Sequence, residues 1–345
     1  MSLTPPFAAN ELWWAFGAET TFGEPAPTVY YAGTLARNDL PMLRQRQNQR
    51  ADWATGCRTP ISFTPGAQMP EGRVRVEPLP TFGRFAGPLP EQLIGAFGVT
   101  PNPDSAPYQF PTLLPSYTNM VGGHYMSGQP FVYVWTGCVV RDAMLSWAEG
   151  EKLQVAFGWE NAFAWIQYNW DLDITAAEIN VGEKPLNFDE GVFFDSGLQG
   201  IEYSHLIRSG RIRMTRRLHR AYGSGAQALH KLAARGCWNI KVLSHTIGAD
   251  FTLFAPDGFA GTNVNVYPWA ANVGANAPKW LGDGTAELTW TDAASGNGLH
   301  VSLFRVHPND SSLAGGRAED LAMFGMDWVA ADWRWQYLVN GVPQN

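Results

Sequence analysis

Residue types and spacings that usually carry chemistry are rare in this 345-residue chain. The seven histidines are scattered, and none forms His-x-x-x-His or lies at metal-ligand spacing from a cysteine. No Cys-x-x-Cys, phosphate-binding Gly-x-x-x-x-Gly-Lys-Ser/Thr or Gly-x-Ser-x-Gly nucleophile motif occurs. Asp171 and Asp173 would share a strand face like a paired-carboxylate site, but a solvated strand edge is the simpler interpretation. The local patterns predict a protein that is not an enzyme and has no metal or cofactor site, although a triad assembled from distant residues leaves no local signal.

The 15 tryptophans favour one alternative chemistry. Trp rings on a β-surface can stack on sugars, and two carboxylates about 5–10 Å apart could then hydrolyse a glycosidic bond. Trp135, Trp147, Trp159 and Trp290, however, lie on predicted strands among apolar neighbours. This setting favours core or subunit-interface positions for them.

Composition favours an all-β protein with long connections. Hydrophobic residues make up 45% of the chain, charged residues only 16%, and there are 36 glycines and 24 prolines. The net charge of -7 argues against a protein that grips nucleic acid by neutralising phosphates. Cys57, Cys138 and Cys237 are interpreted as reduced thiols of a protein made in a reducing cytoplasm. We expect no signal peptide, and no apolar run approaches the ~20 residues of a membrane span.

The strongest structural pattern is a hairpin between Phe131 and Trp159. Apolar residues alternate with more polar ones on both sides of Glu149-Gly150-Glu151, where glycine can adopt a positive φ. A second hairpin is predicted between Thr285 and Leu303, with residues 292–298 as its turn. Both hairpins contain Leu-x-Trp, a turn and Leu-x-Val. This repeat is either a common property of buried hairpins or the trace of a duplication.

The elements around the two hairpins favour duplication. Each half is predicted to contain strand, long loop, strand, helix and hairpin in that order. The remaining predicted elements are strands at Val29–Arg37, Gly197–Leu206 and Arg211–Arg220, helices at Pro90–Phe97 and Gly225–Arg235, and one final strand at Met326–Val339. The predicted domains are residues 1–182, with Pro-rich loops at 38–80 and 100–130, and residues 183–345, with a C-terminal arm. A single large β domain is the alternative.

Two stretches of the first half resemble the major tail tube proteins of long-tailed, siphovirus-type bacteriophages. One is the opening phrase Trp14-Ala-Phe-Gly-Ala-Glu-Thr-Thr-Phe-Gly-Glu-Pro25. The other is the first hairpin, with its Thr-Gly-Cys lead-in at 136–138 and its acidic turn. The resemblance implies a mainly β chain of two tandem tail-tube-like β-sandwich or barrel modules, each with a short flanking helix, plus long Pro-rich loops. It also implies a structural virion protein that polymerises into stacked rings around a channel for DNA.

Contacts between copies would hold such rings together. The candidate interface residues are Arg44, Arg46, Arg50, Glu149, Glu151, Arg211, Arg213, Arg217, Trp333 and Trp335. The arginines could pair with acidic turns of another copy, which would fix register more than affinity. Arg211, Arg213, Arg217 and His219 are expected on one strand face, where a nucleic-acid site is the less favoured alternative.

The resemblance also implies partners and a location. A ring would hold three chains if the duplication is real and six otherwise. Tape measure and tail-end proteins are further expected partners, and genomic DNA would pass a negatively charged lumen without specific binding. No cofactor and no membrane are expected, and the protein would belong to the virion tail after assembly in the host cytoplasm. The alternatives are a carbohydrate-binding or glycoside-hydrolysing β-sandwich of a fibre or baseplate, and a capsid-decoration or adaptor protein.

Overall fold

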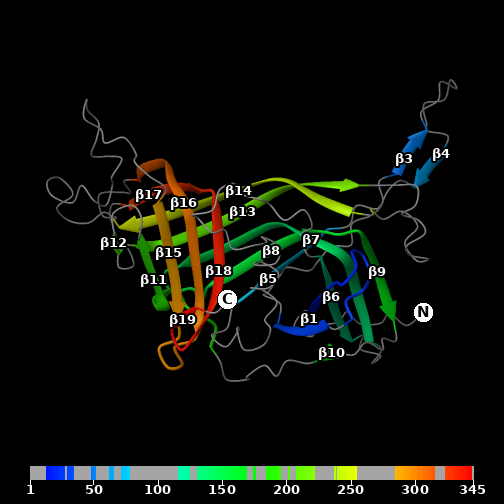
Figure 1. Ribbon diagram of the computed structural model, residues 1–345, viewed down its shortest axis with the longest axis horizontal. Coiled ribbons are helices and arrows are strands. Elements are labelled where there is room, and N and C mark those ends of the chain that lie inside the picture. Colours follow the sequence, from blue (N-terminus) through cyan, green and yellow to red (C-terminus); the bar gives the residue numbers. More distant parts are fainter. Residues whose placement is uncertain are drawn as a thin grey trace, which may run out of the picture.

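The described part of the chain folds almost entirely into β-strands, which confirms the predicted mainly β class. The computed structural model describes residues 13–27, 29–34, 48–51, 62–65, 71–77, 116–124, 130–168, 174–175, 184–195, 201–202, 207–221, 237, 239–254, 284–314 and 323–343. Seventeen of the described strands form one connected system of three sheets, which we call outer sheet 1, the central sheet and outer sheet 2 (Figure 1). A separate hairpin of β3 (Asn48–Ala51) and β4 (Ser62–Pro65) projects at one end.

Outer sheet 1 is built from the first half of the chain. Its strands, in spatial order, are β9 (Phe163–Tyr168), β7 (Pro130–Ala148), β6 (Tyr117–His124), β1 (Trp13–Ala18), β2 (Val29–Thr34) and β10 (Ile174–Thr175). All neighbours are antiparallel except β2 and β10, which are parallel.

Outer sheet 2 is built from the second half. Its strands, in spatial order, are β12 (Ile201–Glu202), β11 (Gly191–Asp195), β15 (Gly284–Thr291), β16 (Gly298–Ala314), β18 (Asp332–Val339) and β19 (Val342–Pro343). A short 3-10 helix, η3 (Phe188–Glu190), immediately precedes β11.

The central sheet joins the two halves. Its order is β5 (Glu71–Val76), β8 (Gln154–Glu160), β7, β13 (Ile207–Ala221), β14 (Asn239–Phe254), β17 (Met323–Ala330) and β16. The long strands β7 and β16 each begin in an outer sheet and end in the central sheet.

A local bend lets each long strand change sheets. Gly137 in β7 has φ 64° and Arg305 in β16 has φ 52°, which places both in the left-handed region where strands kink or bulge. The chain that returns from the central sheet bonds to the residue before each bend. The Ala162 amide donates to the Thr136 carbonyl at 2.9 Å, and the Ala331 amide donates to the Phe304 carbonyl at 3.0 Å.

The strand order of the first half is repeated in the second. Strands β1, β2, β5, β6, β7, β8 and β9 have the same pairings as β11, β12, β14, β15, β16, β17 and β18. Equivalent strand pairs also have the same register. Phe131 of β7 lies opposite Tyr168 of β9, and Leu299 of β16 lies opposite Tyr337 of β18. In this register several residues are identical between the halves, among them Asp142 and Asp310, Leu145 and Leu313, Trp159 and Trp328, Ala162 and Ala331, Gln167 and Gln336, and Tyr168 and Tyr337.

The core lies between the central sheet and the two outer sheets. Trp135 of outer sheet 1 meets Trp159 of the central sheet edge-on, with 5.9 Å between ring centroids. Phe193 of outer sheet 2 stacks on Phe251 of the central sheet at 4.8 Å. Each half is therefore a sandwich of two sheets, as predicted, with large aromatic rings filling the space between them.

Both predicted hairpins are confirmed. The first has its turn at Gly150, whose φ of 73° requires the freedom of glycine, and the second is β15–β16. The matching of the two hairpins differs from the prediction, because the equivalent of β15–β16 is β6–β7 and not β7–β8. The Leu-x-Trp phrases therefore reflect buried hairpins in general.

The remaining predicted strands and helices agree with the structure to different extents. The strand predicted at 211–220 is confirmed as part of β13, and the strand predicted at 29–37 is confirmed over residues 29–34 as β2, with residues 35–37 outside the described ones. Only residues 201–202 of the predicted strand at 197–206 are described, as β12. The single final strand predicted at 326–339 is wrong, because the corner at Ala331 divides it into β17 and β18. The predicted helices at 90–97 and 225–235 lie outside the described residues.

Candidate assembly site at the joint of the two halves

The two halves meet where β7 pairs with β13. The antiparallel register runs from Ser209 opposite Ala148 to Thr215 opposite Asp142. Backbone pairing thus makes one continuous sheet from strands that belong to different halves. At the end of the joint, the Glu149 amide donates to the Arg208 carbonyl at 2.8 Å, and the two side chains form an exposed ion pair at 3.1 Å.

Trp147 anchors the joint. It lies on β7 of the first half and is 6% exposed. Its ring packs against Trp290 and Phe251 of the second half, with 5.1 Å and 6.0 Å between ring centroids. Gly210 on β13 makes room for the ring, because a Cβ at this position would lie 2.2 Å from Trp147 Cζ2. A buried aromatic ring inserted into the opposite half is the usual form of a strong interface anchor.

A second contact at the joint comes from the distal ends of β13 and β14, residues 216–221 and 239–246, which we call the ribbon. Cys237, just before β14, and Ile240 of the ribbon form a buried cluster with Val139, Ala162 and Phe163 of the first half. Burial raises the pKa of the Cys237 thiol to about 11, so this thiol is protonated at neutral pH. The ribbon therefore covers the corner between β8 and β9.

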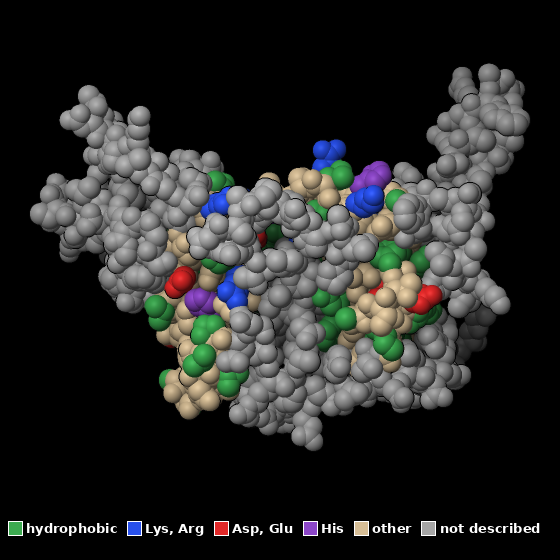
Figure 2. Space-filling view, viewed as in Figure 1, with side chains coloured by type: hydrophobic (Ala, Val, Ile, Leu, Met, Phe, Trp, Pro, Cys, Tyr) green, Lys and Arg blue, Asp and Glu red, His purple; other side chains and the backbone are tan. Residues whose placement is uncertain are grey.

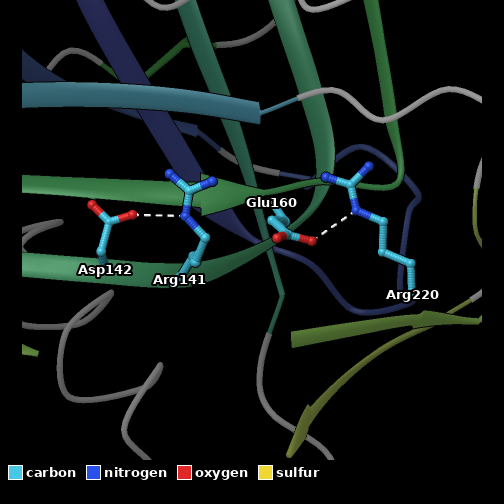
Figure 3. Close-up of polar contacts among 4 residues, drawn as sticks. All are labelled: Arg141, Asp142, Glu160 and Arg220. Atoms are coloured by element: carbon cyan, nitrogen blue, oxygen red, sulfur yellow. Dashed lines mark hydrogen bonds and ion pairs between the residues drawn. The ribbon is translucent and has the colours of Figure 1, made fainter. Parts of the chain in front are cut away.

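An ion pair fastens the ribbon to this corner (Figure 3). Arg220 Nε donates to Glu160 Oε2 at 2.7 Å, and the side chains are only 10% and 19% exposed. Figure 3 also shows Arg141, the extra residue of the bulge in β7, paired with Asp142 at 2.8 Å. A largely buried pair fixes relative position, because moving either partner leaves a desolvated charge behind.

Glu19 fixes the bend of β7 from the opening phrase of the chain. Its carboxylate accepts hydrogen bonds from the Gly137 amide (2.8 Å), the Gly23 amide (2.9 Å), the Ser116 hydroxyl (2.6 Å) and the Thr118 hydroxyl (3.0 Å). Burial raises the pKa of Glu19, and these four donors partly offset that effect. The Glu-Thr-Thr-Phe-Gly phrase is thus a clamp that joins β1, β6 and the bend.

The arginines of β13 divide between two faces. Arg211, Arg213 and Arg217 are exposed, as predicted for one face of this strand. Arg211 is bound to Asp250 at 2.6 Å. Arg216 is instead 5% exposed, and burial lowers its pKa to about 9 while the nearby Asp332 carboxylate opposes that shift. Figure 2 shows Lys, Arg and His side chains gathered over the distal parts of β13 and β14.

The remaining predicted interface residues lie in different surroundings. Glu149 and Glu151 are exposed at the β7–β8 turn, where Glu149 pairs with Arg208 of the same chain. Trp333 and Trp335 are 2% and 1% exposed within the chain's own core. Arg44, Arg46 and the side chain of Arg50 lie outside the described residues.

Two features of the described residues bear on the alternative functions. Within it, no three His, Cys, Asp or Glu side chains are grouped as metal ligands. The four tryptophans predicted to be core residues are all buried, which confirms that interpretation and removes them as sugar-stacking surfaces: Trp135, Trp147, Trp159 and Trp290. Asp171 and Asp173 lie outside the described residues. Among the helices of the described segments, none has the length and apolar character needed to cross a membrane.

Comparison with known families gives one match, in the first half of the chain. The family model of the phage tail tube protein matches residues 14–160. The match spans β1 to β8, including the Glu19 clamp, the bend of β7 and the hairpin at Gly150. It confirms the resemblance to tail tube proteins and indicates a structural protein of the phage tail.

Comparison with individual proteins adds less. No curated protein matches the chain. Fourteen chains of solved structures are similar to it. One is the anti-feeding prophage cap, a tube-terminating cap, with 15% sequence identity over 48% of this chain and 99% of that chain, and a TM-score of 0.30.

Sequence reasoning missed the residues that build the joint. Glu19 was present in the opening phrase, and a lone acid among Thr, Phe and Gly residues is a signal for a capping or clamping role. Trp147 was identified as a buried or interface residue, but its partners in the other half come from strands far away in sequence. Nothing in the basic run distinguishes the buried Arg216 from its neighbour Arg217 except the strand period.

Proposed function

We propose that this protein is the repeating subunit of a phage tail tube, and that its chain is a duplicated tail tube module. The observation that carries the proposal is the repeated strand order, in which two sandwiches share one continuous central sheet. The modules are residues 1–182 and 183–345. A sheet that already continues from one module to the next within a chain can continue in the same way between chains.

The duplication bears on ring stoichiometry. Joints related by the same rotation close into a ring, and successive rings stack by translation. Three chains would supply the six modules that six single-module chains supply in simpler tubes. We therefore propose three chains per ring, with tape measure and tail-end proteins as partners at the ends of the tube.

The exposed face of the central sheet would line the channel. Its other face is covered by the outer sheets, whereas Arg211, Arg213 and Thr215 on this face are exposed. Arg211 and Arg141 are each paired with an aspartate, which reduces the attraction of this surface for phosphates. Together with the net charge of -7, this favours passage of DNA without specific binding. The role is structural and not enzymatic.

Electron microscopy tests the proposal directly. Purified protein, studied across a concentration series by negative staining and light scattering, is expected to form hollow tubes or stacked rings with six modules and three chains per ring. A ring of six chains would refute the stoichiometry. If the protein neither forms rings nor extends tubes when supplied with the tail-end proteins of its own phage, the tube proposal is wrong.

A further inference from the structure

The ribbon touches, in each half, the corner where a strand of the central sheet turns into an outer sheet. One corner is residues 160–163, between β8 and β9, and the other is residues 329–332, between β17 and β18. The two corners are equivalent in the repeated register, because Thr136 faces Phe163 and Phe304 faces Asp332. A segment that contacts both corners can fix how the two halves are oriented.

The ribbon continues beyond the strands that flank it. The pairing of β13 with β7 ends at Thr215, and the pairing of β14 with β17 ends at Ile247. Among the described residues, the two strands then pair only with each other. Leu243 is the extra residue of a bulge between them, and a bulge bends a two-stranded ribbon. This bend suits a ribbon that leaves the central sheet to reach the corner at 160–163.

The base of the ribbon is attached to the corner of its own half. His245 Nε2 donates to the Ala331 carbonyl at 3.0 Å. Arg216, directly opposite His245 in the register, is buried and is attracted by the buried Asp332 carboxylate. Both contacts reach the residues at which β17 turns into β18.

The outer part of the ribbon is attached to the corner of the other half. Arg220 donates to Glu160 at 2.7 Å, which is the ion pair of Figure 3. Ile240 belongs to a buried cluster with Ala162 of this corner, and Leu218 packs against the same cluster. The first half therefore cannot move away from the ribbon without exposing apolar surface and separating two largely buried charges.

Backbone pairing at the joint does not by itself set the angle between the halves. Neighbouring strands are rotated relative to one another by about 10° to 35°, depending on the sheet. A ring of three chains needs a rotation of about 120° per chain, and a ring of four needs about 90°. Variation in twist at two joints per chain, one internal and one between chains, is large enough to cover this difference.

We infer that the ribbon is a brace that holds the two halves at one angle and thereby selects the number of chains that close into a ring. The selection of ring size rests on the proposed tube function, whereas the fixed angle is a property of the single chain. Arg220 and Glu160 are positioning residues of this brace, because they act through the angle between the halves.

The distance between the halves in the unassembled chain tests the brace. Nitroxide labels are attached at Glu24→Cys and Val192→Cys, two exposed positions in the first and second halves. Cys138 and Cys237 are buried, and Cys57 is replaced by serine, so that the introduced cysteines react selectively. Double electron–electron resonance on this chain should give one narrow distribution of distances.

Arg220→Met should widen that distribution at least about twofold, because the ribbon no longer holds the first half. Lys241→Met is the matched control, since it removes the same charge from an exposed position of the ribbon and should leave the width unchanged. Glu160→Gln is a milder variant in case Arg220→Met folds poorly, because it keeps an acceptor oxygen for Arg220 and should widen the distribution less. Widths that are equal to wild type in the folded variants of this pair overturn the brace.

Negative-stain images of assembled protein test the selection of ring size. Wild type and Lys241→Met are expected to form rings of three chains. In Arg220→Met, the fraction of four-chain rings and open arcs should rise at least about tenfold, which corresponds to one order of magnitude in the preference for one ring size. Rings of the wild-type size alone in this variant would overturn the selection of ring size, even if the distance distribution widens.

The two proposals fail in different ways. Wild-type protein that forms no rings or tubes refutes the tube function, and the distance distribution of the single chain still decides whether the ribbon braces the halves. Normal wild-type tubes, together with an unchanged distribution in Arg220→Met, refute the brace and leave the tube function intact.

Discussion

Replacing Glu19 with glutamine removes the clamp on the bend of β7 while changing little in size. The carboxylate accepts four hydrogen bonds, two at each oxygen, and donates none. Each oxygen receives one backbone amide, from Gly23 or Gly137. Whichever way the glutamine amide turns, its NH2 group faces a backbone N–H, and two donors cannot bond to each other.

The magnitude follows from this conflict. Rotation of the glutamine amide changes only which backbone N–H faces the NH2 group, because each carboxylate oxygen of Glu19 accepts one backbone amide. One buried backbone N–H is therefore left without a partner, which costs about 1–3 kcal/mol. Glutamine gains something in return, because it carries no charge to desolvate, and burial already opposes the charge of Glu19. We expect a net loss of about 1–2 kcal/mol in the free energy of unfolding at pH 7.

Denaturant unfolding of the unassembled chain, followed by tryptophan fluorescence, measures the loss. Glu24→Gln is the matched control, since Glu24 lies on the same loop with its side chain exposed and is expected to stay within about 0.5 kcal/mol of wild type. Equal midpoints for Glu19→Gln and Glu24→Gln would show that the four hydrogen bonds contribute no net stability. The clamp would then be only a geometric coincidence of the opening phrase.

Three further substitutions test the joint and the second half. Gly210→Ala should lower the free energy of unfolding by about 1–3 kcal/mol, because the new Cβ forces the Trp147 ring to move. Gly248→Ala is the control and should be near neutral, because its Cβ would meet nothing closer than 3.7 Å. Equal unfolding midpoints for the two variants would contradict this prediction. Arg220→Met should lower the free energy of unfolding by about 2–4 kcal/mol, because it leaves the largely buried Glu160 carboxylate without its cationic partner. In a double-mutant cycle, adding Glu160→Gln should recover part of that loss. Strict additivity of the two substitutions would show that the pair is not coupled. Burial lowers the pKa of His300 in the folded state. Its contribution to stability is therefore present above the unfolded pKa of 6.5 and is lost as the pH falls through the folded pKa. His300→Gln should flatten the pH dependence of the free energy of unfolding in that window, and an unchanged pH dependence would refute the assignment.

Local patterns predicted the individual hairpins and strand faces correctly. The turn at Gly150 and the exposed row Arg211, Arg213 and Arg217 depend only on the period of a strand and on the freedom of glycine. The burial of Trp135 and Trp159 followed from their apolar neighbours in sequence. Such features are set by residues only a few positions apart, which is why one sequence suffices to predict them.

Pairing between distant strands could not be predicted in the same way. The hairpin match based on Leu-x-Trp joined non-equivalent strands, because buried hairpins share the same alternation whatever their place in a sheet. Trp333 and Trp335 looked available to a neighbouring copy, but the corner at Ala331 turns their strand back into outer sheet 2. A bend whose energy depends on a partner strand leaves no clear local signal.

By itself the sequence determined a mainly β chain, its hairpins and its tail tube resemblance, since each rests on short-range alternation, turn residues or a characteristic phrase. Only the tertiary structure decided that β7 and β13 join the halves into one sheet, that Trp147 anchors that joint, and that β7 and β16 each cross from an outer sheet into the central sheet. The physical reason is that backbone hydrogen bonds between strands are independent of residue type. Which edge pairs with which is therefore settled by packing of side chains brought together from distant parts of the chain.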